Sequence, residues 1–213
     1  MSSRPLIVLV HGLFMGRHAM LLLARRLKQD GFEVHCFAYN TVTGSLQTAV
    51  DKLAERLAQD PRPVSLVGHS LGGLVALQTA QNLPVGRLDA VVLLGSPYQG
   101  AQAAQVLQRL GGRIGAGVGR ALSDWAKLES KPTVTAPVFT LSGTLSAGLG
   151  RLLCGFIEPN DGTVTVRETH YPGAISLTLP VSHTGMLFSP RVSEQVSTWL
   201  GSASAGRTLS RVR

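Results

Sequence analysis

The most informative motif in the sequence is Gly68-His69-Ser70-Leu71-Gly72-Gly73. The apolar, β-branched run before it, Val64–Val67, predicts a strand, and the Ala- and Leu-rich run after it, Leu71–Asn82, predicts a helix. A Gly-x-Ser-x-Gly motif in that place predicts a sharp strand-to-helix turn that presents the serine hydroxyl. The positive end of the helix dipole behind Ser70 favours the negative charge that develops when a serine attacks. The pattern therefore favours a nucleophilic serine over a structural turn.

Outward from this motif, apolar runs alternate with stretches of helical periodicity. The predicted strands are Leu6–Val10, Glu33–Phe37, Val64–Val67, Ala90–Leu94, Val138–Leu141 and Ala174–Leu179. The predicted helices are Met20–Gln29, Leu46–Ala58, Leu71–Asn82 and Val192–Leu200. Such alternation predicts an α/β fold, with a mostly parallel sheet of about six strands and helices on both faces. We expect one domain over residues 1–200, followed by a disordered basic tail over residues 201–213.

Composition narrows the class of protein. Of 213 residues, 44% are hydrophobic and 15% are charged, so a sizeable core is expected and wholesale disorder is excluded. The net charge of +8 permits attraction to anionic surfaces, including peripheral contact with an anionic membrane. The basic residues are scattered and no basic stretch is interleaved with aromatics, so no nucleic-acid partner is expected. We see neither a signal-peptide core nor a membrane-spanning run, and we expect a cytoplasmic protein.

A serine nucleophile needs a base within hydrogen-bonding reach, and six histidines compete for that role. His183 follows the last predicted strand and precedes the closing helix, and we predict that it is the base. His11 directly precedes a Gly turn and is expected to be structural. The other four are His18, His35, His69 and His170.

The acid that orients the base is expected between the serine and the histidine in chain order. Asp161 stands in Asn160-Asp161-Gly162, a turn signal after the strand Val138–Leu141, and is the predicted acid. Its competitors are Asp89, Asp124, Glu129, Glu158 and Glu168. Asp89 lies before its strand, at the wrong end of the sheet, and Asp124 lies in a loosely patterned helical region.

Together these motifs resemble the small bacterial lipases and esterases of the α/β-hydrolase superfamily. The matching segments are Val10-His11-Gly12-Leu13, Gly68–Gly73, Gly95-Ser96-Pro97-Tyr98-Gln99-Gly100, Asn160–Val164 and Ser182–Met186. The third segment departs from the Gly-Thr-Pro-His-x-Gly pattern of lipases at Ser96 and Tyr98. The resemblance implies that the backbone N–H groups of Leu13 and Leu71 bind the oxyanion.

The resemblance implies a serine hydrolase that cleaves a small-molecule or lipid carboxylic ester through an acyl-enzyme on Ser70. Thioesterase, phospholipase or acyltransferase activity with the same three residues remains open, and a non-catalytic binding protein is the less favoured alternative. No cofactor or metal is implied, because the chemistry needs only protein groups and water. The Gly-rich segment 99–128 is a candidate lid, although an ordinary helical connection fits it equally well.

Overall fold

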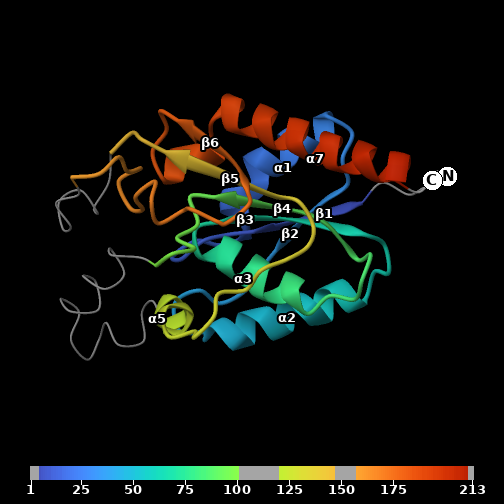
Figure 1. The fold of residues 1–213 in the computed structure, drawn as a ribbon, viewed down its shortest axis with the longest axis horizontal. Coiled ribbons are helices and arrows are strands. Elements are labelled where there is room, and N and C mark those ends of the chain that lie inside the picture. Colours follow the sequence, from blue (N-terminus) through green and yellow to red (C-terminus); the bar gives the residue numbers. More distant parts are fainter. Residues whose placement is uncertain (1–4, 101–119, 147–156, 211–213) are drawn as a thin grey trace.

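The centre of the computed structural model, which describes residues 5–100, 120–146 and 157–210, is an open sheet of six parallel strands (Figure 1). The strand order is β2-β1-β3-β4-β5-β6. The strands are β1 (Leu6–Val10), β2 (Val34–Phe37), β3 (Val64–His69), β4 (Leu88–Leu94), β5 (Val138–Gly143) and β6 (Ile175–Leu179). The predicted parallel sheet of about six strands is confirmed.

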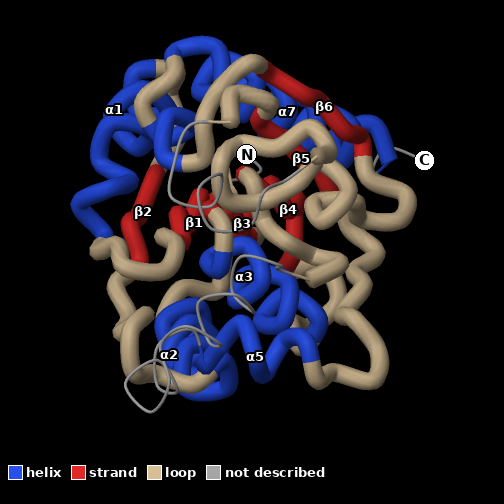
Figure 2. Tube along the Cα trace, turned by 90° about the vertical axis from the view of Figure 1, so that its left-hand side faces the viewer, coloured by secondary structure: helices blue, strands red, loops and turns tan. Residues whose placement is uncertain are grey.

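Helices cover both faces of the sheet, as predicted. The α-helices are α1 (Leu21–Gln29), α2 (Leu46–Ala58), α3 (Leu71–Gln81), α5 (Arg120–Ala126) and α7 (Pro190–Ser210), with short 3₁₀ turns η1 (Arg17–Met20) and η2 (Thr184–Leu187). Figure 2 shows α1 and α7 on one side of the sheet and α2, α3 and α5 on the other.

The alternation of side chains along each strand supplies both layers of the core. On β1, Leu6, Val8 and Val10 pack in the cluster that contains α2 and α3, whereas Ile7 and Leu9 pack in the cluster that contains α1 and α7. Successive side chains of a strand point to opposite faces, so a strand covered on both sides must be apolar throughout. This is why β1 and most of β4 appear in the sequence as unbroken apolar runs.

The register brings the carboxyl ends of the central strands together. Val10 of β1 is opposite Gly68 of β3, Gly68 is opposite Leu93 of β4, and Leu94 is opposite Leu141 of β5. The loops that follow these four strands therefore meet at one edge of the sheet. In parallel sheets this edge is the usual place for a ligand or a reaction.

The segment predicted as a lid is described only at its ends, since residues 101–119 with their apolar and basic positions lie outside the described residues. Its described helix, α5, packs on the core. Trp125 of α5 is buried, and its indole N–H donates to the backbone oxygen of Tyr98 at 3.0 Å. Asp124 accepts a hydrogen bond from the backbone N–H of Leu46 at 3.3 Å and so caps the start of α2. Residues 120–126 thus belong to the helical layer.

The last helix differs from the prediction at its C-terminal end. α7 runs to Ser210, whereas the sequence predicted an end at Leu200 and disorder beyond it. Tertiary contacts explain the extension: Ala203 packs against the core, and the Ser204 hydroxyl donates to Asp89 Oδ2 at 3.3 Å. Gly201 and the serines have low helix propensity, which these contacts override. Within the described chain, no helix is both long and apolar enough to cross a bilayer.

Candidate active site

Ser70 occupies a strained turn between β3 and α3. Its φ and ψ are 54° and −124°, a backbone conformation that residues other than glycine rarely adopt. The Ser70 N–H donates to Leu94 O at 2.9 Å, which ties the turn to the end of β4. A Cβ atom on Gly68 would lie 2.3 Å from the Cα of Gly73, so the strand and helix meet backbone to backbone. The serine side chain is consequently held at the carboxyl edge with 9% of its surface exposed.

His183 and Asp161 form a buried pair at the same edge. His183 Nδ1 lies 2.7 Å from Asp161 Oδ2, and the His183 backbone N–H donates to Asp161 O at 2.8 Å. The second carboxylate oxygen of Asp161 accepts hydrogen bonds from the N–H groups of Thr163 and Val164, at 2.9 and 2.8 Å. The Asn160–Val164 turn thus fixes the carboxylate, and the carboxylate fixes the orientation of the imidazole.

Gly95 connects this pair to the serine turn. It follows Leu94, which holds the Ser70 amide, and its φ is +57°. A Cβ atom at Gly95 would lie 3.0 Å from Asp161 Oδ2 and 3.1 Å from His183 Nδ1. The Asp161–His183 hydrogen bond therefore runs directly over the backbone at the end of β4. Of the three predicted residues, Asp161 and His183 thus contact each other, and Ser70 lies at the same carboxyl edge, tied to the end of β4 through Leu94 O.

The competing acids lie elsewhere or have other partners. Asp89 lies near the amino end of β4, Asp124 caps α2, and Glu129 is exposed. Glu158 forms an exposed ion pair with Arg167 at 3.1 Å, and Glu168 Oε2 accepts the backbone N–H of Thr165 at 2.8 Å. Asp161, by contrast, contacts the side chain of His183.

The two predicted oxyanion donors lie on neighbouring turns. Leu71 is the first residue of α3, where a backbone N–H has no partner within its own helix. Leu13 lies in the turn after β1, next to β3 in the sheet. That turn is held by His11: its ring stacks on Tyr39 at 4.6 Å, and the Tyr39 hydroxyl donates to His11 O at 2.8 Å. His11 thus packs against Tyr39 as part of this turn.

His69 is a residue of this site that the sequence reasoning missed. It is fully buried, and its Nε2 lies 2.9 Å from the backbone oxygen of His183. Burial, and secondarily the charge of His183, lowers the pKa of His69 to about 3. The only signal in the sequence was its place beside Ser70, because the contact joins residues 114 positions apart.

Comparison with known proteins identifies the family of this chain. The profile of the alpha/beta hydrolase family matches residues 7–195. The chain belongs to this family. A further match, 40% identical over 67 residues, is to the uncharacterised protein alr2406 of Nostoc sp. strain PCC 7120. It covers 30% of this chain and only 27% of that protein, so it says nothing about the activity of the hydrolase.

Solved structures support the fold of the hydrolase. The chain resembles the mature lipase BlEst2 of Bacillus licheniformis with a TM-score of 0.76 and 22% identity, over 94% of this chain and 93% of the lipase. It also resembles a monoacylglycerol lipase of Paleococcus ferrophilus with a TM-score of 0.63 and 18% identity, over 93% and 94% of the two chains. At these identities the likeness concerns the fold alone.

Proposed function

We propose that this hydrolase cleaves carboxylic esters through an acyl-enzyme on Ser70, with His183 as general base and Asp161 as the orienting acid. The observation that carries the proposal is the buried 2.7 Å contact between His183 and Asp161, packed over Gly95 at the edge where the strained Ser70 turn lies. The chemistry is supported by the roles these three residue types take in acyl transfer. The lipases that share this fold are consistent with an ester substrate.

In the first half of the reaction, Ser70 Oγ attacks the ester carbonyl and His183 Nε2 takes the hydroxyl proton. Because Nδ1 is held by Asp161, Nε2 is the ring nitrogen left to accept it. The oxyanion of the tetrahedral intermediate is stabilised by the N–H groups of Leu13 and Leu71, aided by the positive end of the α3 dipole. Collapse of the intermediate breaks the bond to the alkoxy group, which leaves as an alcohol with the proton from His183.

In the second half, water attacks the acyl-enzyme. His183 Nε2 removes a proton from the water, a second tetrahedral intermediate forms at the same oxyanion site, and its collapse releases the carboxylic acid and returns the proton to Ser70. Asp161 stays ionised throughout and stabilises the imidazolium that forms in each step. No group outside the protein, the ester and water is needed for the atoms and charges to balance.

The test is turnover of nitrophenyl esters from acetate to decanoate by the wild type, by Ser70→Ala and by Ser65→Ala. Ser65 is the matched control, since it is a buried serine at the other end of the same strand. We expect Ser70→Ala to lower kcat by about 10⁶-fold with an unchanged circular dichroism spectrum, and Ser65→Ala to keep turnover. Near-normal turnover by folded Ser70→Ala would refute the proposal.

The same assay separates the alternatives that use the same residues. Rates on acyl thioesters far above those on the matched oxygen esters would indicate a thioesterase, and ester formation with an added alcohol that outpaces hydrolysis would indicate an acyltransferase. A phospholipase would prefer phosphatidylcholine to the nitrophenyl esters. A folded wild type with no turnover and no reaction with a fluorophosphonate would indicate a binding protein.

A further inference from the structure

His69 connects the serine turn directly to the residue that carries the base. It is the last residue of β3, its neighbour in the chain is Ser70, and its imidazole Nε2 lies 2.9 Å from the backbone oxygen of His183. A carbonyl oxygen can only accept, so Nε2 of His69 must carry the proton and donate it. One hydrogen bond thus spans the gap between the nucleophile turn and the loop after β6.

The other contacts of His183 show why this bond matters. Its ring is held at Nδ1 by Asp161 Oδ2 and its amide by Asp161 O, so both of those contacts come from the acid. His69 holds the carbonyl and also packs its ring against the His183 ring, with centroids 4.7 Å apart. Of these contacts, the two from His69 are those that fix His183 relative to the serine turn.

The surroundings of His69 favour the neutral form. Its Nδ1 is buried and has no hydrogen-bond partner among the described residues, so a second proton there would be an unpaired buried charge. It would also face the positive charge that forms on His183 during the proposed reaction. Burial keeps the pKa of His69 near 3, and the ring therefore stays a neutral donor through the range in which a serine hydrolase works.

We propose that His69 is a positioning residue that fixes the His183 imidazole relative to Ser70 through its hydrogen bond to the His183 carbonyl oxygen. This inference rests on the proposed function, because it assigns His69 a role in the reaction of Ser70 and His183. His69 does not touch the reacting atoms. Its effect is on the fraction of molecules in which the base stands ready to accept the serine proton.

The test compares His69→Leu, which keeps most of the volume but removes the donor, with His69→Gln, whose amide keeps a donor at similar reach. We expect His69→Leu to lower kcat on nitrophenyl butyrate about 10- to 100-fold with little change in KM, because a misplacement of about 1 Å costs about that much. His69→Gln is expected to recover most of the loss. The rate of fluorophosphonate labelling of Ser70 should follow kcat. His35→Leu, which removes a half-buried histidine from β2, is the control and should keep kcat.

A purely structural role for His69 predicts a different result. In that case His69→Leu and His69→Gln would lower the melting temperature, and kcat per folded molecule would be unchanged in both. That outcome would overturn the inference and leave the proposed function intact, whereas turnover by Ser70→Ala would overturn the proposed function itself. If His69→Leu is not recovered folded, His69→Asn replaces it, since its shorter amide does not reach the His183 carbonyl, and it must show the same loss of kcat.

Discussion

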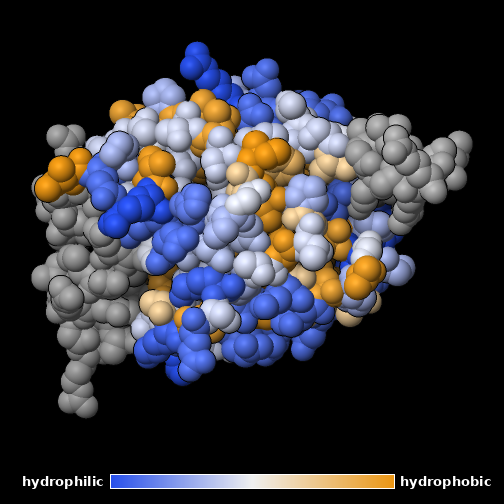
Figure 3. Space-filling view, viewed as in Figure 1, coloured by the Kyte–Doolittle hydropathy of each residue, from blue (hydrophilic) through white to orange (hydrophobic). Residues whose placement is uncertain are grey.

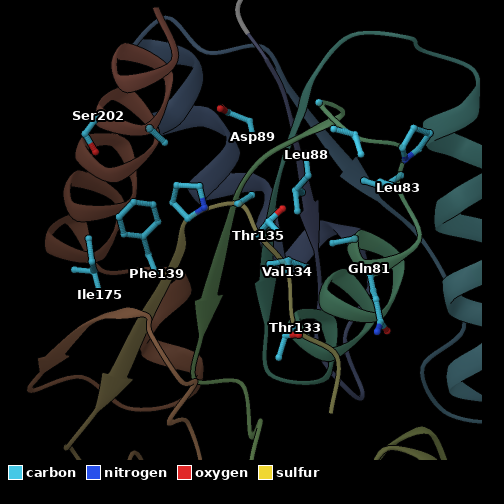
Figure 4. A pocket seen from close by; sticks show the side chains of 17 residues that line it. Gln81, Leu83, Leu88, Asp89, Thr133, Val134, Thr135, Phe139, Ile175 and Ser202 are labelled. Atoms are coloured by element: carbon cyan, nitrogen blue, oxygen red, sulfur yellow. The ribbon is translucent and has the colours of Figure 1, made fainter. Parts of the chain in front are cut away.

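The two ends of the sheet bury different kinds of side chain. At the carboxyl edge, His69 and Ser70 at the end of β3, Asp161 after β5 and His183 after β6 gather beside the turn after β4, and His183 contacts both His69 and Asp161. At the amino edge lies a cavity of about 680 Å³, bounded by the segment after α3, the segment before β5 and the end of α7 (Figure 4). Apolar side chains gather in the middle of the face that Figure 3 shows, between α7 and α3, and exposed Ile175 belongs to the cavity lining.

Asp89, a carboxylate that lines this cavity, has a structural task. Asp89 is buried, and its Oδ2 accepts the hydroxyls of Ser65 at 2.8 Å and of Ser204 at 3.3 Å. It thereby joins β4 to β3 and to α7. This cavity and the candidate site therefore lie at opposite edges of the sheet. In open parallel sheets, ligands and reactions are usually found at the loops that leave the carboxyl ends of the strands.

The largest expected difference between the two edges is in how much kcat falls when a buried polar side chain is replaced. We expect His183→Ala to lower kcat by about 10⁶-fold and Asp161→Asn by about 10⁴-fold, because the base and nucleophile act as a unit while the acid orients the base. Asp89→Asn, the matched buried acid at the amino edge, should change stability and leave kcat per folded molecule near the wild-type value. A loss of kcat in Asp89→Asn as large as that in Asp161→Asn would erase the distinction between the edges.

A smaller difference should separate two glycines that share a left-handed backbone. Gly95 at the carboxyl edge has φ +57° and Gly86 at the amino edge has φ +80°. An alanine at either position is expected to cost about 1–2 kcal/mol of stability through backbone strain alone. At Gly86 the added Cβ meets nothing within 4 Å, whereas at Gly95 it lies 3.0 Å from Asp161 Oδ2.

Gly95→Ala should therefore lower kcat by about 10²-fold as the Asp161–His183 pair shifts, and Gly86→Ala should leave kcat unchanged. Chemical denaturation and ester turnover of the two variants measure both effects. Equal turnover in the two variants would show that the packing of the pair over Gly95 does not matter for the reaction.

The smallest expected effect is on how stability depends on pH. In the unfolded chain His69 takes up a proton near its ordinary pKa of 6.5, but in the folded protein burial lowers its pKa to about 3. Between these values the unfolded state binds one more proton, so the free energy of unfolding falls as pH falls, by about 1.4 kcal/mol per pH unit. His69→Gln should remove that slope between about pH 5.5 and pH 4.5, as measured by denaturation at a series of pH values.

The Asp60–Arg62 ion pair at the amino edge should affect the free energy of unfolding in a lower pH range than His69 does. Arg62 holds the pKa of Asp60 near 2, below its ordinary 3.8, so the stabilisation that this ion pair provides is lost only as pH falls below 3.8.

His11, at the carboxyl edge, also has a lowered pKa because of burial. Its contribution to the pH dependence of stability should be the same in the wild type and in His69→Gln. An unchanged slope in His69→Gln would mean that His69 is charged in the folded protein.

The fold could be predicted because each element carried its own signal. The strands of the centre are apolar on both faces, and the glycines around Ser70 mark the turn, so order, type and approximate bounds followed from the sequence. The sequence predicted Ser70, Asp161 and His183 at one edge of the sheet because residues that follow the carboxyl ends of parallel strands lie at the same edge. The sequence did not predict two features that depend on distant packing, namely the continuation of α7 past Leu200 and the anchoring of α5 by Trp125.

The same limit applies within the candidate site. The bond from His69 to His183 depends on how two loops far apart in the chain settle against each other, and no local spacing encodes it. The close approach of Gly95 to Asp161 is likewise visible only once β4, β5 and the Asn160–Val164 turn are assembled. Local sequence marks which residues are available at the carboxyl edge, and tertiary packing decides which of them touch.

The assignment of Ser70 as nucleophile and His183 as base is tested by locating the covalent adduct of a fluorophosphonate through peptide mass analysis. A serine attacks the phosphorus and displaces fluoride only where a base and an oxyanion site assist it. We predict one adduct per chain, on Ser70, lost in Ser70→Ala and strongly slowed in His183→Ala, while Asp89→Asn is labelled at the wild-type rate. An adduct on another residue, or an equal labelling rate in folded His183→Ala, would contradict the assignment of Ser70 and His183 as nucleophile and base.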